Sequence, residues 1–309
     1  MYTSRQLADL LLSTYFSNKD LGQNFIIDDS IIDYISDLAE LSNQKVERKI
    51  LEIGLGPGAL TQKLLEYNHQ VVGIEIDHLI CEHIRHVFEK EIESKKLILI
   101  EGDALKIDWP KGITDIIANI PYQISSPLLD KITQICKSGE GPSKCIFMFQ
   151  EEFAKRICAD NSFNRGPLWI TTSLDWEVKL GKKISPSSFK PQPKIDSRIV
   201  SFTRRDLLNT DKITELLKSK NLEIPNSRLI RAISSTSFNQ RRKKIRNTLK
   251  RQPSKLKIKH GYEPKMWENI VNKAFLMMGA DFSNYRPEQL SLENWIEFSA
   301  QIEYYRKEL

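Results

Sequence analysis

The sequence predicts an α/β protein in which a doubly wound parallel sheet is followed by a smaller, all-helical domain. Short apolar runs alternate with helical patterns between residues 49 and 149, a spacing typical of a parallel sheet that is covered on both faces. Beyond residue 204 the pattern changes to helices and basic residues, without a clear strand. We therefore expect one domain at residues 1–204 and a second at 205–309, and the length of 309 residues is enough for both.

The elements of the first domain follow from these patterns in order. The segment 28–30 supplies capping side chains for a helix whose apolar positions share one face, namely Ile31, Ile35, Leu38 and Leu41. Helices are expected at 59–67 and 79–93. Strands are expected at 49–53, 71–76, 97–100, 113–118, 145–149 and 199–202. A loop rich in proline and serine, residues 185–193, precedes the last strand.

Composition indicates a soluble globular protein, because 40% of the residues are hydrophobic and 28% are charged. No apolar run approaches the length of a membrane helix, and the first residues lack the core and cleavage site of a signal peptide. The four cysteines form no Cys-x-x-Cys pair, so neither a zinc knuckle nor a disulfide framework is indicated. We expect an intracellular protein with reduced thiols.

Positive charge is concentrated in one segment. Residues 241–259 contain ten Lys or Arg and no acid, whereas the net charge of the whole chain is +6. The rest of the chain therefore carries a net charge of −4. A solvated helix face is the usual explanation of a charge run, but ten cations without a carboxylate favour contact with a polyanion such as RNA.

A glycine-rich loop follows the first strand of the sheet. Gly54, Gly56 and Ala59 fit the pattern G-x-G-x-x-G/A, which brings backbone amides and a helix N-terminus close to a ligand. Glu75 follows about twenty residues later, where a carboxylate can accept the hydroxyls of a ribose. A nicotinamide dinucleotide and S-adenosylmethionine both fit this pattern, and a turn without a ligand is the third reading. Asp103, after the third strand, can accept an adenine amino group or can simply cap a helix.

The tetrapeptide Asn119-Ile120-Pro121-Tyr122 favours methylation when it is combined with Gly54, Glu75 and Asp103, whereas alone it also fits a strand end followed by a proline turn. The exocyclic nitrogen of adenine is a poor nucleophile because its lone pair is delocalised into the ring. The side-chain oxygen of Asn119 and a backbone carbonyl near Ile120 can accept its two hydrogens and localise the lone pair. Pro121 fixes φ and removes a competing donor, and Tyr122 offers a face for base stacking. Hydride transfer has no use for this corner, whereas methylation of an amino group does.

With these motifs the chain resembles the family of ribosomal RNA adenine dimethyltransferases. The matching segments occur in order along the chain: 21–25 (LGQNF), 52–54 (EIG), 73–77 (GIEID), 102–104 (GDA), 119–127 (NIPYQISSP), 149–152 (FQEE), 185–197 (SPSSFKPQPKIDS) and 238–246 (FNQRRKKIR). The resemblance implies a Rossmann-like class I methyltransferase sheet. It also implies dimethylation of two adjacent adenosines near the 3′ end of small-subunit rRNA, with S-adenosylmethionine as the methyl donor.

The resemblance also implies roles for single residues. Cofactor contacts carry over onto Asn24, Ile26, Gly54, Gly56, Glu75, Asp103 and Asn119. Phe189 is expected to wall the pocket for the target base opposite Tyr122, since its proline-bounded loop argues against burial in the core. Residues expected to grip rRNA phosphates are Arg241, Arg242, Lys243, Lys244 and Arg246. The implied partner is a partly assembled small ribosomal subunit, on which we expect a monomer to act. The resemblance also implies a cytoplasmic location in a prokaryote and a nucleolar one in a eukaryote.

Two other functions remain open at this stage. One is a methyltransferase of the antibiotic-resistance type that acts on large-subunit rRNA, and the other is a non-catalytic assembly or transcription factor on the same scaffold. The tyrosine that ends the tetrapeptide and the segment 238–246 favour the small-subunit enzyme. We expect no metal site, because His78, His83 and His86 with Cys81 and Glu82 fit an outward polar helix face better than a ligand set.

Overall fold

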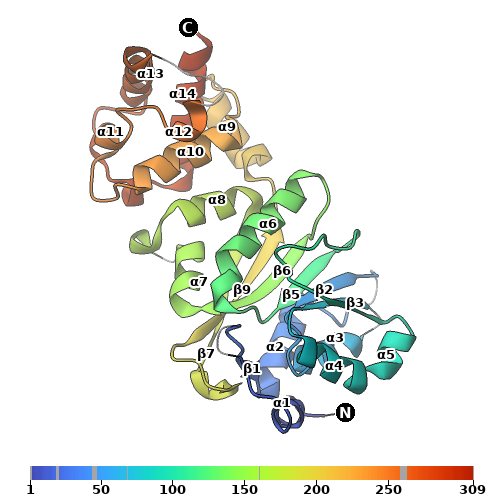
Figure 1. Cartoon of the computed structure of the whole chain (residues 1–309). Helices are drawn as coiled ribbons and strands as arrows, with labels where there is room; N and C mark the ends of the chain where they lie inside the picture. The colour runs from blue at the N-terminus through green and yellow to red at the C-terminus, as the bar shows by residue number, and fades with distance from the viewer. Residues whose placement is uncertain are drawn as a thin grey trace. The chain divides into compact units, whose positions relative to one another are not determined.

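A mostly parallel sheet forms the centre of the first part of the chain in the computed structural model (Figure 1). The structure describes residues 2–18, 21–43, 47–67, 69–159, 161–257 and 263–308. The strands of this sheet are β2 (Lys49–Ile53), β3 (Gln70–Glu75), β4 (Leu97–Glu101), β5 (Asp115–Ala118), β6 (Lys144–Gln150), β7 (Trp176–Ile184) and β9 (Ser197–Arg204). Their order is β4-β3-β2-β5-β6-β9-β7. Neighbours from β4 to β6 are parallel and β9 pairs antiparallel with β6, so the predicted α/β class is confirmed.

By its contacts the chain divides into two compact units. Unit 1 contains Met1–Ala154 and Val178–Arg204, and unit 2 contains Lys155–Glu177 and Arg205–Leu309. Residues 155–177, which were expected to belong to the sheet domain, therefore lie in unit 2. The helices up to residue 158 are α1 (Ser4–Leu12), α2 (Asp29–Ala39), α3 (Ala59–Leu65), α4 (His78–Val87), α5 (Glu89–Glu93), α6 (Ser125–Lys137) and α7 (Glu151–Cys158). A small two-stranded sheet pairs β1 (Phe25–Ile26) with β8 (Phe189–Lys190).

Strand register brings the candidate site together at one edge of the sheet. In β2 and β3, Ile53 pairs with Ile74, so the glycine loop and Glu75 leave the sheet side by side. Strand β5 pairs with the other side of β2 and ends at Ala118, directly before Asn119. Because all three strands are parallel, their carboxyl ends meet at the same edge, which is where open α/β sheets bind ligands.

Both faces of the sheet are buried, as expected for parallel strands. Ile146 and Met148 of β6 pack in a core cluster with residues of α1 to α4. Phe147 and Phe149 alternate with them and therefore point to the opposite face. The Phe147 ring lies 5.6 Å from that of Phe149 and 5.7 Å from that of Phe202 on β9, measured between centroids. The strands consequently hold the site edge on a rigid, two-sided core.

Two local predictions have different outcomes. The side chain of Asp28 caps α2 by accepting the Ser30 amide at 3.1 Å, and Ile31 and Ile35 are buried as predicted. The single helix expected at 79–93 is wrong, because the chain leaves helical geometry at Phe88 with φ −116° and ψ 33°. The buried Phe88 lies against the glycine loop, which explains the break between α4 and α5.

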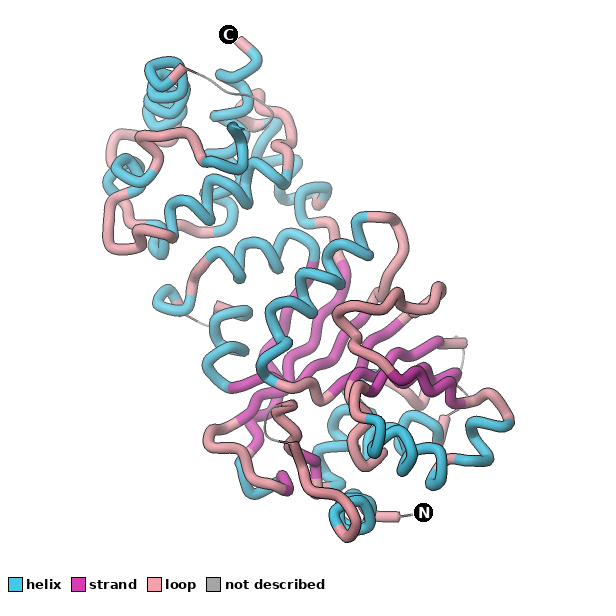
Figure 2. Tube along the Cα trace, in the orientation of Figure 1, coloured by secondary structure: helices cyan, strands magenta, loops and turns pink. Residues whose placement is uncertain are grey.

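Unit 2 is helical, as expected for the second part of the chain (Figure 2). Its helices are α8 (Pro167–Asp175), α9 (Asp211–Lys218), α10 (Ser227–Phe238), α11 (Ile245–Thr248), α12 (Ser254–Lys257), α13 (Pro264–Met277) and α14 (Leu292–Lys307). The fully buried Trp267 and Trp295 lie in its core, and the Trp267 indole donates to the Leu249 carbonyl at 2.8 Å. Ile170 of α8 packs in the same core. Nowhere in the described ranges does a helix combine the length and apolar character needed to cross a bilayer.

Candidate active site

A pocket opens at the carboxyl ends of β2, β3 and β5 and encloses about 1070 Å³ of empty space, including its mouth. The pocket is lined by ten residues that the sequence analysis assigned to the site: Asn24, Ile26, Gly54, Gly56, Glu75, Asp103, Asn119, Ile120, Pro121 and Tyr122. Residues that lie up to 98 positions apart in the chain therefore meet in one cavity, although their individual roles stay predictions.

Glu75 ties the end of β3 to the glycine loop. Its carboxylate accepts the backbone amides of Gly56 at 3.3 Å, Ile76 at 2.9 Å and Asp77 at 3.0 Å. Only 4% of Glu75 is exposed, and burial raises its pKa above the ordinary range, whereas the three amides oppose this rise. Gly56 has φ +52°, and a β-carbon there would lie 2.9 Å from the Phe25 ring, so only glycine fits this position.

Glu52 is a pocket residue that the sequence analysis did not assign to the site. It lies in β2, is 1% exposed, and its side chain accepts the Thr61 hydroxyl at 2.7 Å. Burial raises the pKa of the Glu52 carboxyl to about 8. The signal was present in the sequence, because a lone acid inside the apolar strand 50–53 is unusual for a purely structural residue.

Asp103 lines the pocket from the loop after β4. One of its carboxylate oxygens accepts the Leu105 amide at 2.9 Å, and the other lies 3.2 Å from the Lys106 ammonium. These contacts, the Leu105 amide first, hold the pKa of Asp103 below its ordinary value. Lys131 of α6 steadies the same loop by donating to the carbonyls of Ala104 and Ile107. Asp103 is thus an ionised acceptor on a fixed loop.

Asn119 is fixed by a contact with the N-terminal segment. Its amide nitrogen donates to the backbone carbonyl of Asn24 at 3.0 Å. Within the described ranges the Asn119 side chain makes this hydrogen bond through its nitrogen. Its Oδ1 atom therefore remains available to accept a hydrogen from a ligand. The segment 21–26 that supplies the carbonyl lines the same pocket.

A hydrogen-bonded cluster anchors this N-terminal segment to α4. The Gln23 amide and the Tyr15 hydroxyl lie 3.1 Å and 2.6 Å from the Asp77 carboxylate, which also caps α4 through the Leu79 amide. Burial, followed by the Asp77 contact, raises the pKa of Tyr15. No role was predicted for the residues before 21. No local motif marks Tyr15 as a partner of Asp77, because the two residues lie 62 positions apart in the sequence.

Tyr122 lines the pocket with its hydroxyl fixed 2.6 Å from the Ser197 hydroxyl of β9. Phe189 is different from what the sequence predicted. It is 1% exposed, packs in the core of unit 1 and is not a lining residue of the pocket. The reason is its position opposite Ile26 in the β1–β8 pair, which carries the proline-bounded loop into the core. Of the two aromatic residues expected to face each other across the target base, Tyr122 lines the pocket and Phe189 does not, so the role of Phe189 stays a prediction.

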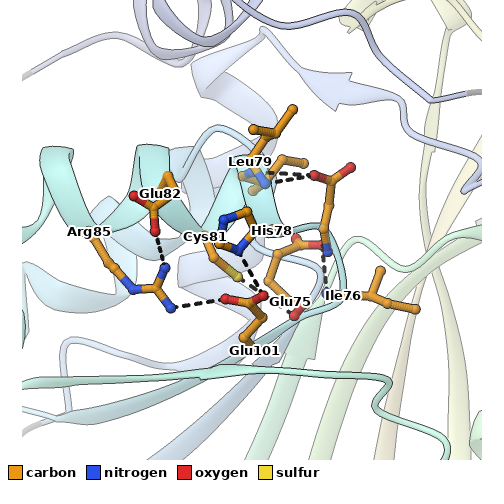
Figure 3. A network of polar contacts seen from close by, with 10 residues as sticks. Glu75, Ile76, His78, Leu79, Cys81, Glu82, Arg85 and Glu101 are labelled. Atoms are coloured by element: carbon orange, nitrogen blue, oxygen red, sulfur yellow. Dashed lines mark hydrogen bonds and ion pairs between the residues drawn. The ribbon is translucent and has the colours of Figure 1, made fainter.

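The histidines of α4 do not form a ligand set. Figure 3 shows the polar contacts of one of them, His78, and of its neighbours. His78 lies 2.9 Å from the Glu101 carboxylate, which also accepts the Arg85 guanidinium at 3.0 Å. His83 and Cys81 do not share the expected outward face, because the half-buried His83 contacts the Pro57 carbonyl and the Cys81 thiol points at the Glu75 carbonyl. Within the described ranges no group of three or more His, Cys, Asp or Glu side chains is arranged to hold a metal ion.

The five residues expected to bind rRNA phosphates lie in unit 2, four of them in the turn between α10 and α11 and Arg246 in the first turn of α11. Arg241 pairs with Glu288 at 3.7 Å, and Lys244 and Arg246 both donate to the side chain of Asn284. Arg242 and Lys243 are exposed, and in the described ranges their side chains make no hydrogen bond or ion pair. Lys259, the last cation of the run, lies outside the described residues. The turn thus presents two cations to a ligand and holds three others in place.

Sequence comparisons match the chain over most of its length. The family model described as ribosomal RNA adenine dimethylase matches residues 16–273. The chain is 32% identical over 290 residues to the ribosomal RNA small subunit methyltransferase A of Clostridium botulinum (strain Kyoto / Type A2), an alignment that covers 91% of this chain and 92% of the relative. It is also 32% identical over 289 residues to the probable ribosomal RNA small subunit methyltransferase A of Thermococcus onnurineus (strain NA1), covering 93% and 92%.

Solved structures share the fold. A dimethyladenosine transferase from Plasmodium falciparum superposes with a TM-score of 0.69 at 24% identity, covering 91% of this chain and 98% of the other. The 23S rRNA methyltransferase ErmE superposes with a TM-score of 0.63 at 22% identity, covering 91% and 100%. At these identities the two likenesses concern the fold alone.

Proposed function

This chain belongs to the ribosomal RNA adenine dimethylase family, and we propose that it dimethylates the exocyclic amino groups of two adjacent adenosines near the 3′ end of small-subunit rRNA. When bound, S-adenosylmethionine supplies an electrophilic methyl group that needs no activation by the protein. The task of this chain is therefore to position two reactants in one pocket. The observation that carries the proposal is the fixed amide of Asn119 at the pocket wall, with its oxygen available as an acceptor.

The pocket fits the cationic donor. Glu52 and Glu75 are two buried carboxyls whose pKa values are raised by burial, and a positively charged ligand favours their ionised forms. Asp103, which stays ionised, offers a fixed acceptor for an adenine amino group. The residues that would hold the donor are Asn24, Ile26, Gly54, Gly56, Glu75, Asp103 and Asn119, all of which line the pocket.

Asn119 orients the target nitrogen. Its Oδ1 atom and the backbone carbonyl near Ile120 accept the two amino hydrogens, which draws the nitrogen lone pair out of the ring and stabilises the positive charge that develops on that nitrogen. The methylated nitrogen then becomes acidic enough to lose a proton to solvent, so no general base is required. Tyr122 stacks on the base, and its contact with Ser197 fixes the plane of the ring. A pocket wide enough for a once-methylated amine allows the second transfer.

Binding of rRNA is assigned to the basic segment of unit 2. Arg242 and Lys243 bind phosphates directly. The other three cations stabilise the turn through their contacts with Glu288 and Asn284 and increase its positive electrostatic potential; they are Arg241, Lys244 and Arg246. Such contacts give affinity without reading sequence, so the shape of a partly assembled small subunit would present the target adenosines. We propose that a monomer acts on this particle in the cytoplasm.

The test is transfer of tritium from labelled S-adenosylmethionine to small subunits, large subunits and naked rRNA, each prepared without the modification. We expect two adjacent dimethyladenosines in the small subunit, and little label in the other two substrates. Preferential labelling of large subunits would overturn the substrate assignment. Absence of label from all three, with the donor bound, would overturn the enzymatic assignment.

A further inference from the structure

An aromatic ring stands almost free of the surface in unit 2. Phe163 is 82% exposed and lies in a short helical turn, Ser162–Asn164, for which the side chain of Asn161 acts as the cap by accepting the Asn164 amide at 3.1 Å. Arg165, which follows this turn, places its guanidinium carbon 5.3 Å from the centroid of the Trp169 ring. The turn thus holds an exposed aromatic face that is available to a stacking partner.

Phe163 lies beside the basic segment. The Arg241 guanidinium donates to the Phe163 carbonyl and also pairs with Glu288 at 3.7 Å. Arg241 therefore acts as a link between the two turns, and the exposed cations that follow it are Arg242 and Lys243. This arrangement joins an aromatic ring to unpaired positive charge within one unit.

A second ring lies at the other end of the same turn. The Ile245 amide donates to the Tyr285 carbonyl at 2.9 Å, and Tyr285 is 44% exposed. Its ring is steadied by an edge contact with the buried Phe282, with centroids 6.3 Å apart and ring planes at 86°. Asn284, directly before it, accepts hydrogen bonds from Lys244 and Arg246. The cationic turn is thus hydrogen-bonded to an exposed aromatic residue at each end.

We propose that Phe163, Arg242, Lys243 and Tyr285 form a binding surface for an unpaired strand of the rRNA, with bases stacked on the two rings and phosphates held by the two cations. This surface is called the aromatic–cationic surface, and its assignment rests on the proposed function. Positive charge with aromatic rings is the combination that binds single-stranded nucleic acids, because every base has a face to stack and every linkage has a charge. Paired bases are stacked on one another, so a duplex would use only the cations.

The contributions of stacking and of charge to RNA affinity can be separated by measuring that affinity at several salt concentrations. Stacking on an aromatic ring changes little with salt, whereas phosphate contacts release counterions and weaken steeply as salt rises. Replacing Phe163 should therefore lower affinity at every salt concentration without altering the slope of log Kd against log salt. Replacing Arg242 or Lys243 should alter the slope. If the surface binds another protein instead, replacing Phe163 should not lower the affinity for RNA, and replacing Arg242 or Lys243 should not alter the slope.

The experiment measures binding of the full chain to a 12-nucleotide single-stranded RNA, to the same RNA with abasic residues, and to an RNA duplex of equal length. For Phe163→Ala we expect roughly five- to 100-fold weaker binding of the single strand and almost no change with the abasic strand or the duplex. Phe163→Trp should restore the affinity. Leu276→Ala removes a side chain that is 77% exposed in the same unit and serves as the matched control, with no change expected.

Two results would overturn the proposal. One is unchanged binding of the single strand by Phe163→Ala and by Phe163→Ala/Tyr285→Ala. The other is an equal loss of affinity for the single strand and its abasic form. In either case methylation of small subunits by the wild-type chain would show that the proposed function stands and only the aromatic–cationic surface fails. Loss of labelling by the wild-type chain itself would instead overturn the proposed function.

Discussion

The amide nitrogen of Asn119 donates to the backbone carbonyl of Asn24 at 3.0 Å, across 95 positions of the chain. This bond does two things at once. It holds the N-terminal segment against the end of β5, and it sets the orientation of the amide so that Oδ1 is the free acceptor. Since Asn24 lines the pocket, the same contact couples the donor site to the group that we propose orients the target nitrogen.

Replacement of Asn119 by alanine should separate binding from chemistry. The substitution removes the acceptor for the amino hydrogens, so we expect kcat to fall by about 100-fold or more, as for loss of a charge-stabilising group in other sites. Donor binding should weaken far less, because the other lining residues remain. Rates come from labelled methyl transfer and donor affinity from calorimetry. Turnover near the wild-type rate, with the variant folded, would contradict the role given to Asn119.

The pocket was predictable from the sequence because its residues follow strand ends. Gly54, Glu75 and Asn119 come directly after, or at the end of, a buried strand, Asp103 follows the end of β4 by two residues, and parallel strands bring such ends together. The packing of Phe189 was not predictable in this way. Its burial depends on pairing between β1 and β8, two strands of two residues each, separated by more than 160 positions. No local pattern marks so short a pair.

Two further differences between the predicted and the observed structure also depend on contacts between distant parts of the chain. Helix α4 ends at Phe88 because its ring contacts Gly58, and a helical periodicity does not show what lies opposite one position. Residues 155–177 join unit 2 because Ile170 and Leu174 pack with the helices beyond residue 205, which a boundary drawn from composition along the chain does not detect.

Gly58 should be intolerant of any side chain. It has φ +90°, and a β-carbon there would lie 2.4 Å from Cε2 of the buried Phe88 ring. Gly58→Ala combines left-handed strain with overpacking and should lower the free energy of unfolding by about 2–4 kcal/mol. The matched control is Gly112→Ala, which has φ +78° but no atom within 4 Å of the added carbon, so it should cost only about 1 kcal/mol.

Urea unfolding of both variants, and of Gly58→Ala/Phe88→Ala, measures the contact. The double variant should show a favourable coupling of about 1–3 kcal/mol, because truncating Phe88 makes room for the new methyl group. Equal destabilisation by the two glycine substitutions would mean that strain alone matters and that Phe88 does not restrict the loop.

Glu52 should make the stability depend on pH. Burial raises its pKa from 4.5 to about 8, so the folded state binds the proton more tightly than the unfolded state. The stability that this provides is fully present below pH 4.5 and is lost as the pH rises through about 8. Glu52→Gln removes the titration and keeps an acceptor for Thr61, so the variant should gain several kcal/mol relative to the wild type between pH 4.5 and 9, at roughly 1.4 kcal/mol per pKa unit.

Denaturant unfolding of the wild type and Glu52→Gln at pH 4.5, 6, 7.5 and 9, without donor, tests this. Glu75 is present in both proteins, and because its charge also raises the pKa of Glu52, the difference reports Glu52 together with its coupling to Glu75. Parallel curves across the whole range would show that Glu52 is already ionised in the folded state and that burial does not control it.

Arg242 and Lys243 should determine the salt dependence of rRNA binding. Both are exposed in the turn between α10 and α11, where the described part of the chain gives their side chains no ion pair. Each phosphate contact contributes about 0.7–0.9 to the slope of log affinity against log salt, so Arg242→Ala/Lys243→Ala should lower the slope by roughly 1.5. Filter binding of unmodified small subunits between 50 and 300 mM salt gives the slope. The control Lys218→Ala/Lys265→Ala removes the same net charge from exposed positions of unit 2 and should leave the slope nearly unchanged. If both double variants changed the slope equally, binding would depend on net charge alone, and the turn would have no special part in holding rRNA.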